Sequence, residues 1–183
     1  MVYCYLANGF EEIEALATVD ILRRADIEVR TVGVDEDVII GSHQIPVLAD
    51  IREEKVILDD NVEAVILPGG MPGTLNLQKS AEVQKAIDFA LSNNKYLCAI
   101  CAAPLILGHK GILENKNATC YPGFEKDLHG ANATGGFVEA DGKIITAKGA
   151  GVAIDFGLTI VEKLRSKEEA QKINASIQSK CSF

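Results

Sequence analysis

The chain has 183 residues, of which 48% are hydrophobic and 24% are charged, and its formal net charge is -8 at pH 7. This length suits one domain with a core large enough to need no disulfide or metal support. Because the 18 Lys and Arg residues are scattered along an acidic chain, no basic patch could neutralise a row of phosphates, and we expect no nucleic-acid partner.

The composition is typical of a cytoplasmic protein. Residues 1–7 lack the basic start and the long apolar run of a secretory signal, and no apolar stretch reaches the roughly 20 residues that cross a bilayer. The five cysteines form an odd set without zinc-like spacing, which is typical of reduced thiols rather than of a secreted disulfide framework. We therefore expect a cytoplasmic location, free thiols and no membrane contact.

The first part of the chain predicts a βαβ unit. Residues 2–7 and 28–34 are short apolar runs, and between them apolar residues recur at three- and four-residue spacing, as on one face of a helix. Asn8, followed by Glu11, suggests a capping box that starts this helix at about residues 9–11.

The middle of the chain continues with short elements and a glycine-rich loop. Residues 38–40 and 45–48 predict a small hairpin. Residues 64–67 predict a buried strand that runs into the loop 68–73, where glycines allow a close approach of the backbone. Helical spacing then returns over residues 81–91.

The remainder of the chain completes an alternating pattern. A strand is predicted over residues 96–100 and a helix after Pro104, whose fixed φ suits a first helical turn. Residues 138–145 predict a hairpin with an Asp-Gly turn, and helices are predicted over 152–164 and 167–177. Alternation of this kind predicts an α/β fold with a mainly parallel sheet covered on both faces, and such sheets bind ligands at the carboxyl ends of their strands.

Cys101 is the strongest candidate for a reactive side chain. It follows a predicted strand, precedes a predicted helix, and has the small residues Ala99 and Ala103 two positions to either side, as in a nucleophile elbow. Amides at such a turn favour a thiolate and can hold an oxyanion. The alternative is that Cys101 is a small buried hydrophobic residue, as free cysteines often are.

Two further cysteines, Cys98 and Cys120, are candidate partners of Cys101. Cys98 completes a C-x-x-C pattern, but it lies within the predicted strand, so a thioredoxin-like dithiol is the weaker interpretation. Cys120 is a better candidate for a resolving thiol, although it also fits an ordinary strand residue.

Glu14 is the candidate acid or base. Glu11 and Glu12 fit the favourable interaction of exposed carboxylates with a helix start. Glu14 lies one turn further on, beside Ala17 and Thr18, so its carboxyl is either partly buried with a raised pKa or simply solvated. The pattern leaves both possibilities open.

No cofactor site is apparent in the sequence. His43, His109 and His129 lie in a predicted turn, late in a helix and in an irregular loop, and no His, Asp or Glu spacing is typical of a metal site. Gly69-Gly70 and Gly149-Ala-Gly151 do not match the glycine pattern of a dinucleotide-binding or phosphate-binding loop. We therefore expect turnover to need neither a metal nor a nucleotide.

Four segments in chain order carry a family resemblance, namely residues 8–14 (NGFEEIE), 67–70 (LPGG), 99–104 (AICAAP) and 148–156 (KGAGVAIDF). Together they resemble the ThiJ/PfpI superfamily, and most closely its parkinsonism-associated deglycase branch, the DJ-one-like proteins. The resemblance implies a flavodoxin-like three-layer sandwich, a single class I glutamine amidotransferase-like domain over residues 1–183, and usually a homodimer to which residues 11–25 contribute.

The resemblance also implies roles for particular residues. Cys101 matches the nucleophile of the family and Glu14 a protonated carboxyl bonded to it, while Gly70 and Ala102 match the two oxyanion-hole positions. Ala102 replaces the His of the protease branch, Tyr121 stands where a His is often found near the nucleophile, and His43 aligns with a pocket Arg. The candidate pocket residues are Gly69, Tyr121, Cys120, His43 and Lys148.

The function implied is cofactor-free processing of small 2-oxoaldehydes by a glyoxalase- or deglycase-type lyase or hydrolase. Cys101 would add to the aldehyde to form a hemithioacetal, and Glu14 would move a proton before water releases the hydroxy acid. On glyoxal-modified amines and thiols the same addition would be deglycation. The alternative is a redox-sensing or chaperone-like protein with Cys101 oxidised to the sulfinic acid, and a weaker one is a peptidase or amidase, which Ala102 disfavours.

The protonation state expected for Glu14 and Cys101 follows from the repulsion between two negative charges. An ionised Glu14 would oppose a Cys101 thiolate, so we expect Glu14 to be protonated at neutral pH and to donate a hydrogen bond to the sulfur. The thiol pKa is then expected well below its free value of about 8.5.

Overall fold

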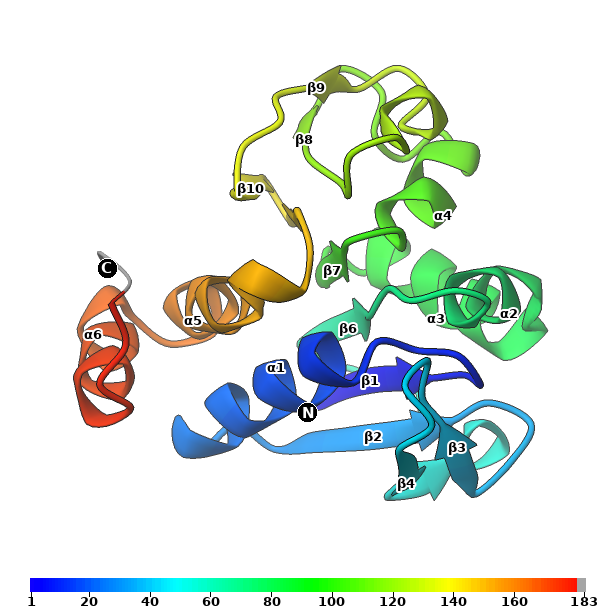
Figure 1. Ribbon diagram of the computed structural model, residues 1–183, viewed down its shortest axis with the longest axis horizontal. Helices are drawn as coiled ribbons and strands as arrows, with labels where there is room; N and C mark the ends of the chain where they lie inside the picture. Colours follow the sequence, from blue (N-terminus) through cyan, green and yellow to red (C-terminus); the bar gives the residue numbers. More distant parts are fainter. Residues whose placement is uncertain (181–183) are drawn as a thin grey trace.

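A mainly parallel sheet of seven strands forms the middle of the molecule in the computed structural model, which describes residues 1–180 (Figure 1). Its strand β10 pairs antiparallel with β11, whereas the other pairings within this sheet are parallel. From one edge to the other the strands are β10 (Val138–Asp141), β11 (Ile144–Ala147), β7 (Tyr96–Ile100), β6 (Ala64–Leu67), β1 (Val2–Leu6), β2 (Val29–Gly33) and β5 (Ile51–Arg52).

Helices flank the sheet, and two pairs of short strands lie outside it. The helices are α1 (Glu12–Arg24), α2 (Gly73–Lys79), α3 (Ala81–Ser92), α4 (Pro104–His109), α5 (Ala153–Leu164) and α6 (Lys167–Ser176). The outer strand pairs are β3 (Val38–Ile40) with β4 (Pro46–Leu48), and β8 (Asn117–Ala118) with β9 (Asn132–Ala133). Short 3-10 turns occur at η1 (Glu53–Lys55), η2 (Glu125–Asp127) and η3 (Ala150–Val152).

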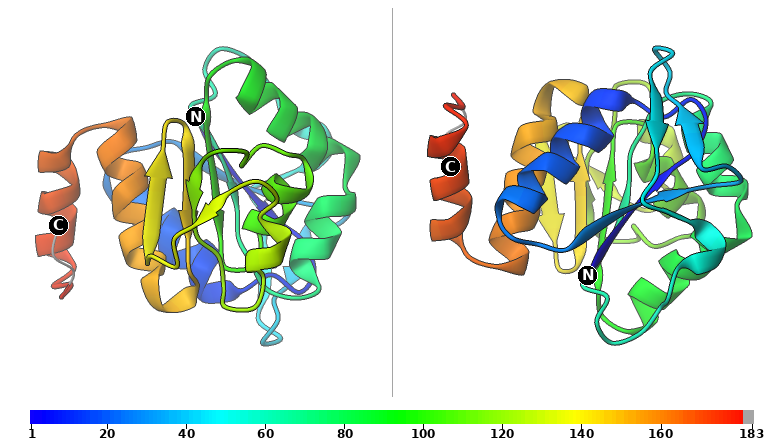
Figure 2. Two further views of the ribbon diagram at one scale, coloured as in Figure 1. Left: turned by 90° about the horizontal axis from the view of Figure 1, so that it is seen from above. Right: turned by 90° about the horizontal axis from the view of Figure 1, so that it is seen from below.

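Two hydrophobic cores, one on each face of the sheet, produce the three layers. Side chains alternate along a strand, so Cys4 of β1 belongs to the core under α1 and α5, whereas the adjacent Tyr3 and Tyr5 belong to the core under α3 and α4. Helix α6 packs outside α5 (Figure 2). The predicted α/β, flavodoxin-like sandwich with a mainly parallel sheet is therefore confirmed.

Most predicted elements occur within one to three residues of their expected bounds, including the start of the first helix, but the residue predicted to cap that helix was wrong. Glu11, not Asn8, caps α1, because its Oε1 accepts the Ile13 amide at 3.3 Å. The Asn8 Oδ1 instead accepts the Ile40 amide at 2.8 Å and so ties the turn after β1 to β3. The side chain that was expected to cap the helix therefore makes a long-range contact.

Helix α2 was not predicted. It begins at Gly73, has only seven residues and lacks a side-chain cap, so neither its periodicity nor its start is visible in the sequence. No helix among residues 1–180 combines the length and apolar character needed to span a membrane.

The sheet register places three loops beside one another. Cys4 of β1 pairs with Ile66 of β6, and Ile66 pairs with Cys98 of β7, so these parallel strands end at about the same level. The order of strands also reverses between β1 and β6, where sheets of this kind leave a crevice for a ligand. The segments that follow β1, β6 and β7 carry the candidate residues.

Candidate functional site

Cys101 occupies a strained turn between β7 and α4. Its φ is 64°, in the left-handed region that costs a non-glycine residue on the order of 1–3 kcal/mol. Backbone bonds on both sides hold this conformation, since the Cys101 amide donates to the Ala147 carbonyl and the Tyr121 amide donates to the Cys101 carbonyl, each at 2.8 Å. The strand-turn-helix geometry predicted for Cys101 is confirmed.

Glu14 projects from the first turn of α1 into this crevice, where its side chain is almost completely buried. The residue is 1% exposed, and Oε2 accepts the Gly69 amide at 2.8 Å. The other oxygen, Oε1, is buried without a hydrogen-bond partner. Burial raises the pKa of Glu14 to about 7, against the lowering effects of the Cys101 side chain and the Gly69 and Ala150 amides. The question that the sequence left open is thus answered in favour of a buried carboxyl.

Gly69 and Gly70 are required for the close approach of these two side chains. A Cβ at Gly69 would lie 2.7 Å from both the Cys101 Cβ and the Glu14 Oε2. Gly70 has a φ of 88°, and a Cβ there would lie 2.4 Å from the Glu11 amide nitrogen. Any other residue in this loop would push α1 away from the β7 turn, so the glycines fix the distance between acid and thiol.

The direction of the Cys101 pKa shift is opposite to the one expected from the sequence. Burial, then the negative charge on Glu14 and the hydrogen bond with it, raise the pKa of the thiol to about 12. The amides of Ala102 and Gly70 lower it, but by less. Glu14 and Cys101 together therefore hold one proton between about pH 7 and about pH 12. In one of the two arrangements this proton is on the Cys101 sulfur and Glu14 is ionised.

The remaining described cysteines are buried. Cys98 and Cys4 lie in the strands, and burial raises the pKa of both. Burial also raises the pKa of Cys120 to about 11, helped by Glu125 and Asp127 and opposed by Lys148. Cys181 lies outside the described residues.

Limiting alkylation is expected to modify Cys101 first. It is the one cysteine among residues 1–180 that is not buried, so iodoacetamide can reach its sulfur without local unfolding. The measurement is mass mapping of the folded Cys181→Ser protein at several pH values. Faster labelling of Cys4, Cys98 or Cys120 would contradict this assignment.

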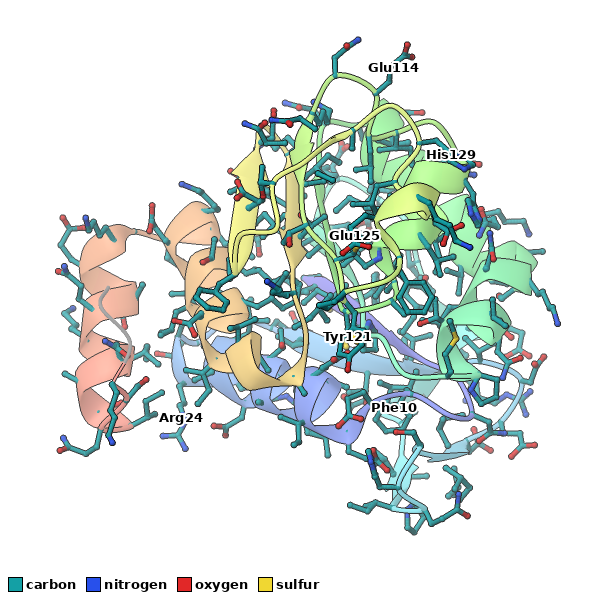
Figure 3. All side chains as sticks on the ribbon, turned by 45° about the horizontal axis from the view of Figure 1, so that its top comes forward. Phe10, Arg24, Glu114, Tyr121, Glu125 and His129 are labelled. Atoms are coloured by element: carbon teal, nitrogen blue, oxygen red, sulfur yellow. The ribbon has the colours of Figure 1, made fainter. Side chains whose placement is uncertain are left out.

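An open hollow of about 270 Å³ lies beside the pair. Tyr121, labelled in Figure 3, is 51% exposed on the wall of this hollow. Its amide donates to the Cys101 carbonyl, and the Ala150 amide donates to the Glu14 carboxyl. Lys148 donates to the Gly135 carbonyl at 3.0 Å, with its Nζ 5.6 Å from the centre of the Phe137 ring. The hollow is lined by Tyr121, Pro122, Phe137, Lys148, Gly149, Ala150, Gly151 and Val152.

Cys120 lines a second hollow, of about 240 Å³, which shares Pro122 and Lys148 with the first. The structure thus places Tyr121 and Lys148 on the wall of the first hollow and Cys120 on the wall of the second.

His43 lies at the tip of the β3–β4 hairpin, where it binds the start of α1. Its Nδ1 is 3.0 Å from the Glu12 Oε2, and its amide donates to the Glu12 Oε1 at 2.8 Å. Burial opposes ionisation of Glu12, but the bonds from His43 and nearby amides lower the Glu12 pKa to about 2, and the pKa of His43 is raised by the same bond. The expectation of an exposed Glu12 was therefore wrong, because the hairpin covers it.

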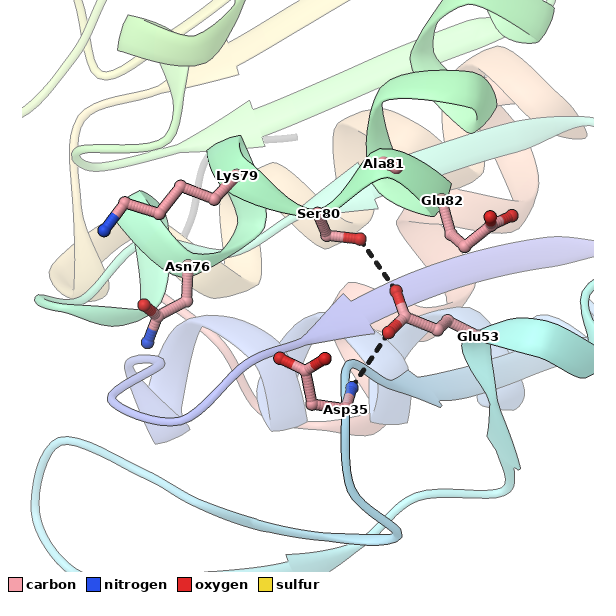
Figure 4. A pocket seen from close by; sticks show the side chains of 7 residues that line it. All are labelled: Asp35, Glu53, Asn76, Lys79, Ser80, Ala81 and Glu82. Carbon is pink, nitrogen blue, oxygen red and sulfur yellow. Dashed lines mark hydrogen bonds between the residues drawn. The ribbon is translucent and has the colours of Figure 1, made fainter.

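A larger cavity, of about 390 Å³, lies elsewhere and contains none of the predicted site residues (Figure 4). Glu53 is buried at its wall, where it accepts the Asp35 amide at 2.9 Å and the Ser80 hydroxyl at 2.7 Å. Both carboxylate oxygens of Glu53 are thus occupied in joining η1 to the turn after β2 and to the start of α3.

The sequence model of the DJ-1/PfpI family matches residues 1–163. "Protein DJ-1 homolog B" of Arabidopsis thaliana is 36% identical over 94% of this chain, although the chain spans only 40% of that relative. "Protein dj-1beta" of Drosophila melanogaster is 33% identical, with 92% of this chain and 91% of the relative covered. "Glutathione-independent glyoxalase DJ-1" of Schizosaccharomyces pombe is 28% identical over 94% of this chain and 95% of the relative.

Solved structures agree with the sequence relationships. The structure described as "Toxoplasma gondii DJ-1, oxidized" has a TM-score of 0.93 at 32% identity, covering 98% of both chains. Schizosaccharomyces pombe DJ-1 has a TM-score of 0.88 at 28% identity, covering 97% of this chain and 98% of the other.

Proposed function

Because this chain belongs to the DJ-1/PfpI family, we propose that it is a cysteine-dependent enzyme that converts small 2-oxoaldehydes to hydroxy acids without glutathione. The observation that carries the proposal is the buried carboxyl of Glu14 beside the Cys101 thiol, next to an open hollow. The name of the fission yeast relative, a glutathione-independent glyoxalase, supports this choice of substrate class.

The first step is addition of the Cys101 sulfur to the aldehyde carbon. With a pKa of about 7, Glu14 is suited to take the thiol proton near neutral pH as the C–S bond forms. The carbonyl oxygen becomes an oxyanion, which the amides of Gly70 and Ala102 stabilise, since these amides already interact with the sulfur. Glu14 then gives the thiol proton to this oxyanion, so the product is a neutral hemithioacetal on Cys101 and Glu14 is again ionised.

The later steps need only proton transfer and water. Glu14 removes the proton from the former aldehyde carbon, and the hydroxyl proton on that carbon moves to the neighbouring carbonyl oxygen. Glu14 then returns its proton to the neighbouring carbon, which leaves a thioester on Cys101 and an alcohol beside it. Water then hydrolyses the thioester to the hydroxy acid and restores the thiol. The unpartnered Glu14 Oε1 is available for this transfer. With a glyoxal-modified amine or thiol as substrate, release of that group makes the reaction a deglycation.

Lactate is expected from methylglyoxal in the absence of glutathione, and EDTA with exhaustive dialysis should leave the rate unchanged. All proposed steps use side chains, backbone amides and water of the crevice. The measurement is chiral lactate analysis of the reaction, with heat-unfolded protein as the control. Dependence on added glutathione, or a loss of activity that zinc restores, would contradict the proposed mechanism.

A second candidate function is redox sensing, in which one hydrogen peroxide oxidises the Cys101 thiol to a sulfenic acid and a second oxidises this to the sulfinic acid, each with release of one water. Two observations favour it, the buried Glu14 carboxyl hydrogen-bonded to the Cys101 thiol and the oxidised state of the Toxoplasma gondii relative. A stable oxidised protein without turnover would support this function over the first. A peptidase or amidase is disfavoured because Ala102 supplies no base next to the nucleophile.

A homodimer is expected in solution, with α1 in the contact. Ile13 and Leu16 of this helix are 58% and 37% exposed, so an apolar part of α1 faces outward. Light scattering should give about twice the 19.6 kDa of one chain. A mass of one chain at micromolar concentration would remove this prediction, and Ile13→Glu should shift the population towards monomer.

A further inference from the structure

We propose that His109, Asp127 and His129 form a binding site for a divalent transition-metal ion such as Zn²⁺, separate from the Cys101 crevice. One ligand atom from each residue lies within 4.8 Å of the other two. The His109 Nε2 is 3.3 Å from the Asp127 Oδ1, and the two imidazole centres are 5.0 Å apart. No residue of the cluster lines the hollow beside Cys101.

The backbone holds the three residues together. His109 is the last residue of α4, and Gly108 before it permits close packing, because a Cβ there would overlap the Asp127 carbonyl oxygen. Asp127 and His129 flank the buried Leu128, which anchors their segment in the core on that face. His129 lies at the outer surface near α4 (Figure 3). The ligands therefore come from two elements that the core already fixes against each other.

The donor set and its spacing suit zinc. Two imidazole nitrogens and a carboxylate are a common zinc ligand set that leaves a fourth position for water. Ligands at about 2.1 Å from a tetrahedral ion lie about 3.4 Å apart. The His109 to Asp127 separation of 3.3 Å already matches this value, and rotation of the exposed His129 ring can close the remaining gap.

Gln78 of α2 provides an outer partner for His109. Its side-chain amide lies 2.8 Å from the His109 Nδ1, and a side-chain amide can present its oxygen as readily as its nitrogen. In that orientation the oxygen accepts Nδ1–H and leaves the Nε2 lone pair for the metal, the arrangement that usually orients a ligating histidine. A bound ion would thus join α2, α4 and the segment after η2.

A second group, Glu11, Glu12 and His43, has similar spacing and serves as the matched control. It offers one imidazole rather than two, and the Glu12 oxygens are occupied by the His43 side chain and amide. It is therefore the poorer zinc site.

The test is zinc chloride titration by calorimetry, with thermal unfolding, on Cys101→Ser protein without a histidine tag, so that the reactive thiol cannot bind the ion. One zinc ion per chain and a raised Tm are expected. His109→Gln or His129→Gln should weaken binding at least tenfold and abolish the rise in Tm, whereas His43→Gln should change neither. Equal binding by His129→Gln, loss of binding in His43→Gln, or no binding at all would overturn the proposal.

A second measurement avoids the variants and so does not depend on their folding. Diethyl pyrocarbonate modification of the same protein, mapped by mass spectrometry, should show that zinc protects His109 and His129 and leaves His43 reactive. Protection of His43 alone, or of none of the three, would overturn the site.

Discussion

Replacement of Cys101 by Ser is expected to lower kcat/KM for methylglyoxal by on the order of 10³-fold or more. An alcohol is a much weaker acid than a thiol, so Glu14, with a pKa of about 7, cannot generate the attacking group from it. The fold should be retained, because serine is slightly smaller than cysteine and the backbone bonds of the turn are unchanged. The measurements are glutathione-free turnover, circular dichroism and Tm.

Cys98→Ala is the matched control for this substitution. Cys98 lies three residues away, is completely buried in β7 and faces the core, so its loss should leave turnover close to that of the wild type. Equal losses in both variants would indicate a dithiol function for the C-x-x-C pattern. Turnover in Cys101→Ser near the wild-type rate would remove Cys101 from the mechanism.

Glu14→Gln is expected to separate thiol reactivity from turnover. The change removes the charge that raises the Cys101 pKa while keeping a hydrogen-bond donor, so iodoacetamide should label Cys101 faster than in the wild type at neutral pH. Turnover should nevertheless fall by on the order of 10²–10⁴-fold, because an amide cannot carry a proton between carbons. Glu14→Leu should lose as much turnover but label more slowly than Glu14→Gln, since it provides no donor.

The pH dependence of the wild type gives an independent check on the same carboxyl. With the Glu14 pKa raised to about 7, the base form and hence turnover should increase as the pH rises through 7. The folded state holds the Glu14 proton more tightly than the unfolded state does. The free energy of unfolding should therefore fall by about 3 kcal/mol as the pH rises from the unfolded pKa of Glu14 through 7. Glu14→Gln should abolish that loss of stability. If Glu14→Leu matches the wild type in labelling, turnover and pH profile, Glu14 is not the acid/base.

Local patterns were sufficient to predict the sheet apart from its edge strand β5, the flanking helices apart from α2, and the turn at Cys101. Strand and helix periodicities depend only on short segments of the sequence. The alanines around Cys101 likewise indicate a tight turn without any information on its tertiary contacts. The glycines at 69 and 70 likewise indicated a close backbone approach. The side chain that approaches these glycines, Glu14, could be inferred only from the resemblance to a known family, because it is distant from them in the sequence.

Tertiary packing decided the ionisation and the surroundings of the site. Glu12 and Glu14 look alike as helix-start carboxylates, yet the hairpin around His43 lowers the pKa of one and the crevice raises the pKa of the other. The direction in which the Cys101 pKa shifts depends on two opposing effects. Burial beside Glu14 raises this pKa and two backbone amides lower it, and no local sequence pattern shows which effect is larger. His109, Asp127 and His129 come together for the same reason, since α4 and the loop after η2 meet only in the folded chain. Electrostatic effects depend on distance and burial in three dimensions, whereas sequence periodicity records only neighbours along the chain.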